Sequence, residues 1–142
     1  MTQHFLEGKT INTIQIGSRD QRAVLFKCVD GDHIAIADTD GGPCAPVWIE
    51  SIEAPALGFP CAVLSVTDLD LSTNNEETDR GDVIDHYGCK ISTDKGDIVI
   101  EYRNENNGFY GGWLEWPDGR NYENIMEEQC IYNENWQEVE FV

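Results

Sequence analysis

The segment DLDLSTNNEETDRGDVIDH, residues 68 to 86, concentrates groups that could bind a cation or a basic protein surface. It holds one arginine and seven carboxylates, which are Asp68, Asp70, Glu76, Glu77, Asp79, Asp82 and Asp85. Oxygen-rich loops bind hard cations such as Ca²⁺, and a dense negative field attracts basic proteins. The third interpretation is a solvated connection whose charge keeps the protein soluble.

An EF-hand alignment of this segment fails at two positions. With Asp68 at position 1 of the loop, Thr73 falls at position 6 and Asp79 at position 12. Position 6 needs glycine for a sharp turn, and position 12 needs a bidentate glutamate. The flanking residues also have the pattern of strands, whereas an EF-hand needs helices. We therefore predict no metal ion and no cofactor, with a less regular carboxylate site as the open alternative.

A second acidic segment lies near the C-terminus. Residues 115 to 140 carry eight carboxylates, Glu127 and Glu128 among them, against Arg120. If both segments lie on one side of a sheet, their field would steer a basic protein surface and imitate the phosphate line of a nucleic acid.

Histidine and glycine-rich motifs give weaker signals. His86 lies near Asp82 and Asp85, and a carboxylate beside an imidazole can orient a general base or a metal ligand. His33 lies at the mouth of an expected hairpin. No Ser or Cys lies in a nucleophile turn, and no second histidine ligand is spaced on the same element. We therefore predict no catalytic residue. The glycine pairs do not have phosphate-loop spacing.

Several aromatic side chains are candidates for stacking a base or a partner's side chain. Tyr110 and Trp113 flank two glycines in FYGGWLEW, and Trp48 follows a proline in an expected strand. Exposed aromatic rings beside glycine stack on bases, with Arg103 as a cation for a phosphate. Packing of these rings on a small core is the alternative.

The composition limits the possible functions. The chain has 142 residues, 40% of them hydrophobic, and a net charge of −18 with nine Lys and Arg. Direct nucleic-acid binding is disfavoured because phosphate contacts need clustered cations. The five cysteines form no CxxC pair, which is typical of core thiols in a reducing cytoplasm. The chain has no basic, apolar leader and no run of 18 apolar residues, so we expect a cytoplasmic protein without a membrane partner.

The periodicity predicts a mainly antiparallel β domain over residues 1–142 with one or two short helices. Alternating or apolar runs predict strands at 10–18, 23–29, 33–38, 46–52 and 61–69, with Asp30-Gly31 as the turn of a hairpin. Residues 87–93, 97–103 and 109–116 are expected to form a three-stranded meander. Residues 122–142 predict a short helix and a last edge strand.

Short motifs in this β-rich region resemble a family of short, mostly phage-borne proteins of unknown function. The matching residues, within roughly 8 to 115, are Trp48, Ile49, Glu50, Ile52, Thr73, Asn74, Asn107, Gly108 and Tyr110. Many members carry Asp-Cys-Cys-Glu before the aromatic segment, where this chain reads GPCA and keeps only Cys44. The resemblance implies a small β-rich fold and a phage or prophage origin, and it brings no known catalytic residue.

These observations lead to one hypothesis and two alternatives. We expect a non-enzymatic, phage-type binding protein that antagonises a host defence system. Its acidic segments would occupy the basic, nucleic-acid-binding groove of a nuclease or CRISPR-type effector. One alternative is a sponge that sequesters a nucleotide immune signal on Trp48, Tyr110 or Trp113. The other is a metal-assisted hydrolase that uses His86.

Overall fold

The computed structural model describes residues 4–56, 58–117, 122–131 and 134–139. In this part of the chain ten strands, two short 3₁₀ turns and one helix are formed. The strands are β1 (Thr10–Gly17), β2 (Ala23–Cys28), β3 (Gly31–Thr39), β4 (Val47–Glu53), β5 (Cys61–Asp70), β6 (Glu76–Glu77), β7 (Val83–Thr93), β8 (Gly96–Asn106), β9 (Gly112–Glu115) and β10 (Trp136–Glu138). The 3₁₀ turns are η1 (Gly42–Cys44) and η2 (Ser72–Asn74), and the helix is α1 (Tyr122–Glu128).

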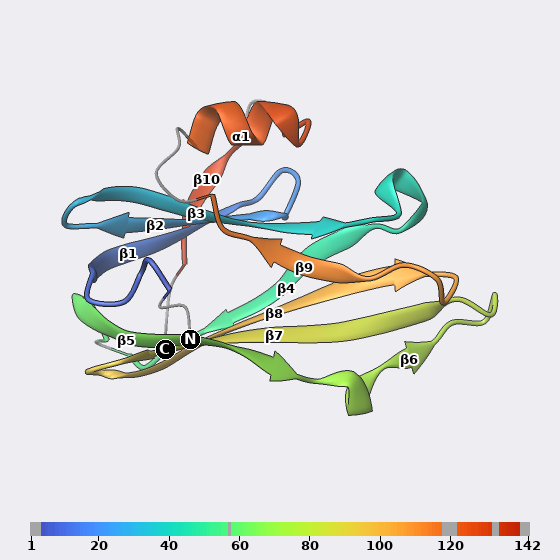
Figure 1. Cartoon of the computed structure of the whole chain (residues 1–142), viewed down its shortest axis with the longest axis horizontal. Helices are drawn as coiled ribbons and strands as arrows, with labels where there is room; N and C mark the ends of the chain where they lie inside the picture. Colours follow the sequence, from blue (N-terminus) through green and yellow to red (C-terminus); the bar gives the residue numbers. More distant parts are fainter. Residues whose placement is uncertain (1–3, 57, 118–121, 132–133, 140–142) are drawn as a thin grey trace.

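The strands follow the order β4-β8-β7-β5-β1-β2-β3-β9 and fold into two layers (Figure 1). β1, β2, β3 and β9 lie in one layer, and β5, β7 and β8 lie in the other. Every pairing is antiparallel; β10 is added to β1, and β6 to β7. The mainly antiparallel β fold predicted from the sequence is confirmed.

Side chains from both layers meet in one core between them. Phe26 and Ile14 from one layer and Ile49, Ile91 and Ile100 from the other are all fully buried in this cluster. The sequence of β8 specifies which of its side chains enter this core, because buried positions alternate strictly with half-buried ones from Ile98 to Asn106. Side chains two residues apart point to the same face of a strand, and the strand predicted for residues 97–103 is confirmed.

Helix α1 covers the outer face of β2 and β3 (Figure 1). Ile125 and Met126 form a second buried cluster with Ala23, Ile34 and Ile36. β2 and β3 are therefore covered on both faces, which explains why AVLF and IAIA are continuous apolar runs. The predicted helix and last edge strand near the C-terminus are also confirmed, since β10 pairs with the end of β1. No helix in the described ranges has the length and apolar character of a membrane span.

The hairpin of β2 and β3 was predicted correctly, but its turn lies one residue earlier than expected. Cys28 pairs with Gly31, so Val29 and Asp30 are the central residues. Gly31 has φ +135, a conformation that disfavours any residue with a Cβ.

The three-stranded meander predicted for residues 87–116 is wrong in its last strand. β7 and β8 form the expected hairpin, but β9 pairs with β3 in the other layer. Gly111 and Gly112 lie against Tyr87, and the Gly112 N–H donates to the Tyr87 hydroxyl over 3.2 Å. This close approach lets the chain cross between the layers, and Phe109 and Tyr110 lie outside the strand.

Two asparagines are buried at the end of the core where β8 meets η1. The Asn104 amide donates to the carbonyl oxygens of Ala45, at 2.9 Å, and Pro46, at 3.2 Å. The Asn106 amide donates to the Asn104 side-chain oxygen at 2.8 Å and to Asp85 at 2.9 Å. Buried amides are tolerated only when their hydrogen bonds are made, so this ladder links β8 to the connection before β4.

Asn104→Ala should lower the free energy of unfolding by about 1–3 kcal/mol, because it leaves buried backbone and Asn106 groups unsatisfied. Urea denaturation followed by circular dichroism measures the change. The control is Asn74→Ala at an exposed position, which should change stability by less than about 0.5 kcal/mol. Equal losses in both variants would contradict a special role for the buried ladder.

Candidate partner-binding edge

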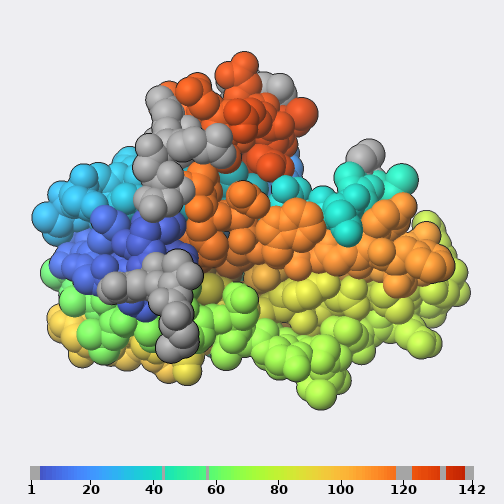
Figure 2. All heavy atoms as spheres, in the orientation of Figure 1, coloured from blue at the N-terminus to red at the C-terminus, as the bar shows by residue number. Residues whose placement is uncertain are grey.

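Residues 68–77 form an edge of the sandwich and are not an open loop. β5 extends to Asp70, and η2 and β6 continue the edge along β7, where Glu76 pairs with Ile84. Residues 66 to 70 pair with β7 on one side, while β1 pairs only with residues 61 and 62 among the described strands. Figure 2 shows this light-green segment projecting from its layer. We call residues 68–82 the acidic edge.

The carboxylates of the acidic edge point to both faces of the sheet. Asp68 lies opposite Cys89 and Asp70 opposite Tyr87, so both side chains are on the core-side face of β5. Both are exposed, in the part of β5 that extends beyond its pairing with β1. Glu76 accepts a hydrogen bond from His86, which points to the outer face. Negatively charged side chains are therefore present on both faces of the acidic edge.

Two of the acidic residues shape the local backbone. The Asp70 carboxylate accepts hydrogen bonds from the Ser72 hydroxyl and backbone N–H, which lower the pKa of Asp70. Asp85 accepts one bond from Asn75 at 3.0 Å and another from Asn106 at 2.9 Å. Between them lies a shallow hollow of about 230 Å³. Asp85 thus holds the edge in place, while Asp70 remains at the surface.

The acidic edge contains one cation, Arg80, and in the described ranges its carboxylates form no ion pair with Lys or Arg. The ion pairs of Lys and Arg found there join Lys9 to Asp30, Arg22 to Asp38, Lys27 to Asp32 and Arg103 to Glu101. Of the seven carboxylates between residues 68 and 85, only Glu76 has a basic partner, His86 at 2.7 Å. The negative field of this edge is therefore available to a partner.

His86 pairs with a different carboxylate from those expected by sequence proximity. Its Nε2 contacts Glu76, while Asp85 is engaged by two asparagines and Asp82 lies in the turn that closes β6 on β7. The histidine side chain is 11% exposed. No serine or cysteine contacts His86 in the described hydrogen bonds. The contact between His86 and Glu76 joins β7 to β6.

The part of the second acidic segment that lies on α1 does not extend this surface. Glu127 and Glu128 are exposed on α1, which packs outside β2 and β3. In Figure 1 α1 and β6 lie on opposite sides of the sandwich. Glu127 and Glu128 therefore do not share one surface with the acidic edge.

The three candidate stacking residues have different neighbours. Trp48 is in β4 directly opposite Arg103, and Trp113 is in β9 opposite Asp38. Tyr110 packs on Gly41, where an added Cβ would lie 2.7 Å from the tyrosine ring. Only Trp48 therefore has a cationic side chain as its cross-strand neighbour.

A larger hollow of about 500 Å³ lies between η1 and the end of α1. Its only charged donor among the described lining residues is Arg22, whose guanidinium donates to Ala37 O and to the main chain and side chain of Gln129. Asp38 is 3.5 Å from the same guanidinium. These contacts attach the helix to β3 and leave the arginine charge compensated.

Comparison with known protein families identifies one match. The model of a domain of unknown function, DUF7448, matches residues 5–116, which is most of the chain. This chain belongs to the DUF7448 family. No significant match to a curated protein or to a solved structure was found. In this DUF7448 protein the matched region spans β1 to β9, including the acidic edge, while α1 and β10 lie beyond it.

Sequence reasoning missed the asparagines that hold the DUF7448 site together. Asn75 donates from its side chain to Asp85 and accepts from the backbone N–H of His86 at 2.7 Å. Asn106 reaches the same carboxylate from β8. The sequence does indicate that Asn104 and Asn106 are buried, because they continue the series of inward-facing positions formed by Ile98, Ile100 and Tyr102.

Cysteine reactivity should divide the five thiols of the DUF7448 chain into two groups. Burial raises the pKa of Cys28 and of Cys89 to about 12 and also raises the pKa of Cys61, so little thiolate forms at neutral pH. Cys44 and Cys130 are exposed. Ellman's reagent at pH 8 should modify those two rapidly and the buried three only after denaturation. Rapid modification in a Cys44→Ser, Cys130→Ser double variant would contradict this.

Proposed function

We propose that this chain is a non-enzymatic, phage-type binding protein that antagonises a host defence system in the cytoplasm of the host cell. The acidic edge would occupy a basic, nucleic-acid-binding groove on a nuclease or CRISPR-type effector. The observation that carries this proposal is the set of exposed carboxylates on an unpaired strand edge, without a Lys or Arg partner in the described ranges.

The geometry of the edge supports mimicry of a nucleic-acid backbone. Asp68 and Asp70 lie on one face of β5, and two strand residues span about 6.7 Å. A groove that binds a row of backbone phosphates presents a row of cations, and carboxylates repeated on one face of the edge are complementary to such a row. Since α1 lies on the opposite side of the sandwich, we assign the partner to the acidic edge and not to Glu127 and Glu128.

Two chemical features favour binding over catalysis. The buried thiols have raised pKa values, which disfavours the nucleophilic thiolate. In the described ranges no group of three metal-binding side chains forms around His86, so the metal-assisted hydrolase that uses His86 is the least supported alternative.

Charge reversal at the edge tests the proposal. Asp68→Lys with Glu77→Lys changes two exposed residues whose side chains form no hydrogen bond in the described structure, so the fold should persist. The matched control, Glu127→Lys with Glu128→Lys, makes the same charge change on α1. In pull-downs from host lysate, the edge variant should lose a nucleic-acid-binding protein that the wild type and the control retain. Its affinity should fall at least about tenfold.

Two further measurements sharpen this experiment. Binding should weaken between low and high salt, because screening shortens the range of the field, and duplex DNA should displace the captured protein. Equal capture by the edge variant and the control would sink the proposal.

A nucleotide sponge is the second candidate, and the cross-strand neighbours Trp48 and Arg103 favour it. An indole ring can stack on a base while an adjacent guanidinium contacts a phosphate. Purified protein incubated with a panel of nucleotide signals should release a ligand on heating. Trp48→Ala should weaken retention by about tenfold or more, and Trp113→Ala should not. Absence of released nucleotide from the wild type would count against the sponge.

A further inference from the structure

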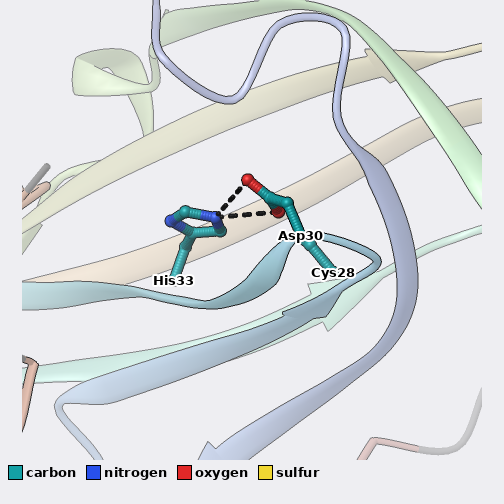
Figure 3. A group of neighbouring side chains, drawn as sticks. All are labelled: Cys28, Asp30 and His33. Carbon is teal, nitrogen blue, oxygen red and sulfur yellow. Dashed lines mark hydrogen bonds and ion pairs between the residues drawn. The ribbon is translucent and has the colours of Figure 1, made fainter. Parts of the chain in front are cut away.

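The hairpin between β2 and β3 gathers three potential metal ligands of different chemical types. Cys28 ends β2, Asp30 is in the turn and His33 is in β3 (Figure 3). The sulfur, one carboxylate oxygen and one imidazole nitrogen lie within 4.8 Å of one another. In Figure 3 the carboxylate and the imidazole point toward each other above the strands.

Strand register explains why these side chains meet. His33 pairs with Phe26, and Cys28 lies two residues further along β2, so Cys28 and His33 are diagonal neighbours on one face. The two-residue turn then brings Asp30 over the same end of the hairpin. This gives the spacing Cys-x-Asp-x-x-His, which contains no CxxC or HxxxH pattern.

Neighbouring groups hold the turn in place. The Val29 N–H donates to the Thr10 carbonyl at 3.0 Å, which attaches the turn to the adjoining strand. The His33 ring lies 5.4 Å from the ring of Phe5. One oxygen of Asp30 is 3.1 Å from His33 Nε2, while Lys9 donates to the other oxygen over 2.7 Å. Lys9 can therefore stay bonded to Asp30 while the first oxygen binds a metal ion.

The distances fit a small tetrahedral site. With ligand bonds of about 2.0–2.1 Å for nitrogen and oxygen, tetrahedral geometry separates those ligands by about 3.3 Å. The separation of 3.1 Å between Asp30 and His33 is already close to this value. Distances from a zinc-bound sulfur to the other ligands would be about 3.5 Å, so the cluster must contract by at most about 1.3 Å.

The donor set selects the class of cation. A thiolate and an imidazole favour borderline-soft ions such as Zn²⁺ over Ca²⁺ and Mg²⁺, which prefer oxygen ligands. Burial, and secondly the charge of Asp30, raise the pKa of Cys28, so the free thiol is protonated. When the metal binds, the thiol proton is released to solvent, and the His33 ring changes tautomer so that its proton moves from Nε2 to Nδ1 and frees Nε2 as a ligand. The cation offsets the repulsion between thiolate and carboxylate.

We propose that Cys28, Asp30 and His33 bind one zinc-type divalent cation through three protein ligands, with water in the fourth position. The site is at the opposite end of β2 and β3 from β9, and it uses none of the residues of the acidic edge. It is therefore independent of the function proposed above.

Cobalt titration tests this site directly, because a bond between Co²⁺ and a thiolate produces a charge-transfer band in the near ultraviolet. The full chain carrying Cys44→Ser and Cys130→Ser serves as the background, since it removes the exposed thiols. The band should saturate at one equivalent of Co²⁺ and disappear when Zn²⁺ is added. Absence of a band at about ten equivalents of Co²⁺ would overturn the proposal.

Variants of the ligands assign the site. Cys28→Ser in this background should abolish the band, while His33→Gln and Asp30→Asn should weaken Zn²⁺ binding at least about tenfold by calorimetry. Asp30 and His33 lie at the exterior end of the hairpin, so their variants test binding even if Cys28→Ser unfolds. Cys89→Ser and His86→Gln are the matched controls and should keep the band. A band that survives Cys28→Ser, or Zn²⁺ affinity unchanged in both other variants, overturns the assignment.

Discussion

The short junction between β1 and β5 is the constraint on which the rest of this structure depends. The two strands share two residue pairs, Thr10 with Ala62 and Ile11 with Cys61, and then separate. This separation lets one continuous order of strands bend into two layers with a common core. It also frees the second half of β1, where β10 is added, and the second half of β5, which becomes the acidic edge.

Charge and hydrogen bonding are distributed unevenly around this framework. The buried asparagines form a polar end to an otherwise apolar core, and through Asp85 they fix the base of the acidic edge. The carboxylates further out along β5 and β6 have few such bonds. Unpaired strand edges promote association between sheets, and charged side chains are a common protection against it. A single arrangement of carboxylates can thus prevent self-association and attract a basic partner.

The sequence predicted what depends on local periodicity. Alternation in residues 97–103 and the apolar runs in β2 and β3 identified strands, and the tail was correctly divided into a helix and a strand. The pairing of β9 with β3 could not be predicted this way, because it depends on how closely Gly112 approaches Tyr87 from another layer. The position of Glu127 and Glu128 on the side opposite the acidic edge is likewise set by the packing of α1, which charge counts do not reveal. Within the site, proximity along the chain suggested that Asp82 or Asp85 would be the partner of His86. In the structure β6 folds back onto β7 and brings Glu76 to His86 instead.

Helix α1 also shows that the family boundary and the folding unit differ. The region shared with DUF7448 ends at residue 116, yet Ala23, Ile34 and Ile36 within it are buried only because residues 125, 126 and 131 cover them. A chain shortened to the shared region would present a bare apolar sheet face, and such faces tend to associate. In this protein the segment beyond the family match therefore completes the packing of the matched region, and a minimal expression fragment must include it.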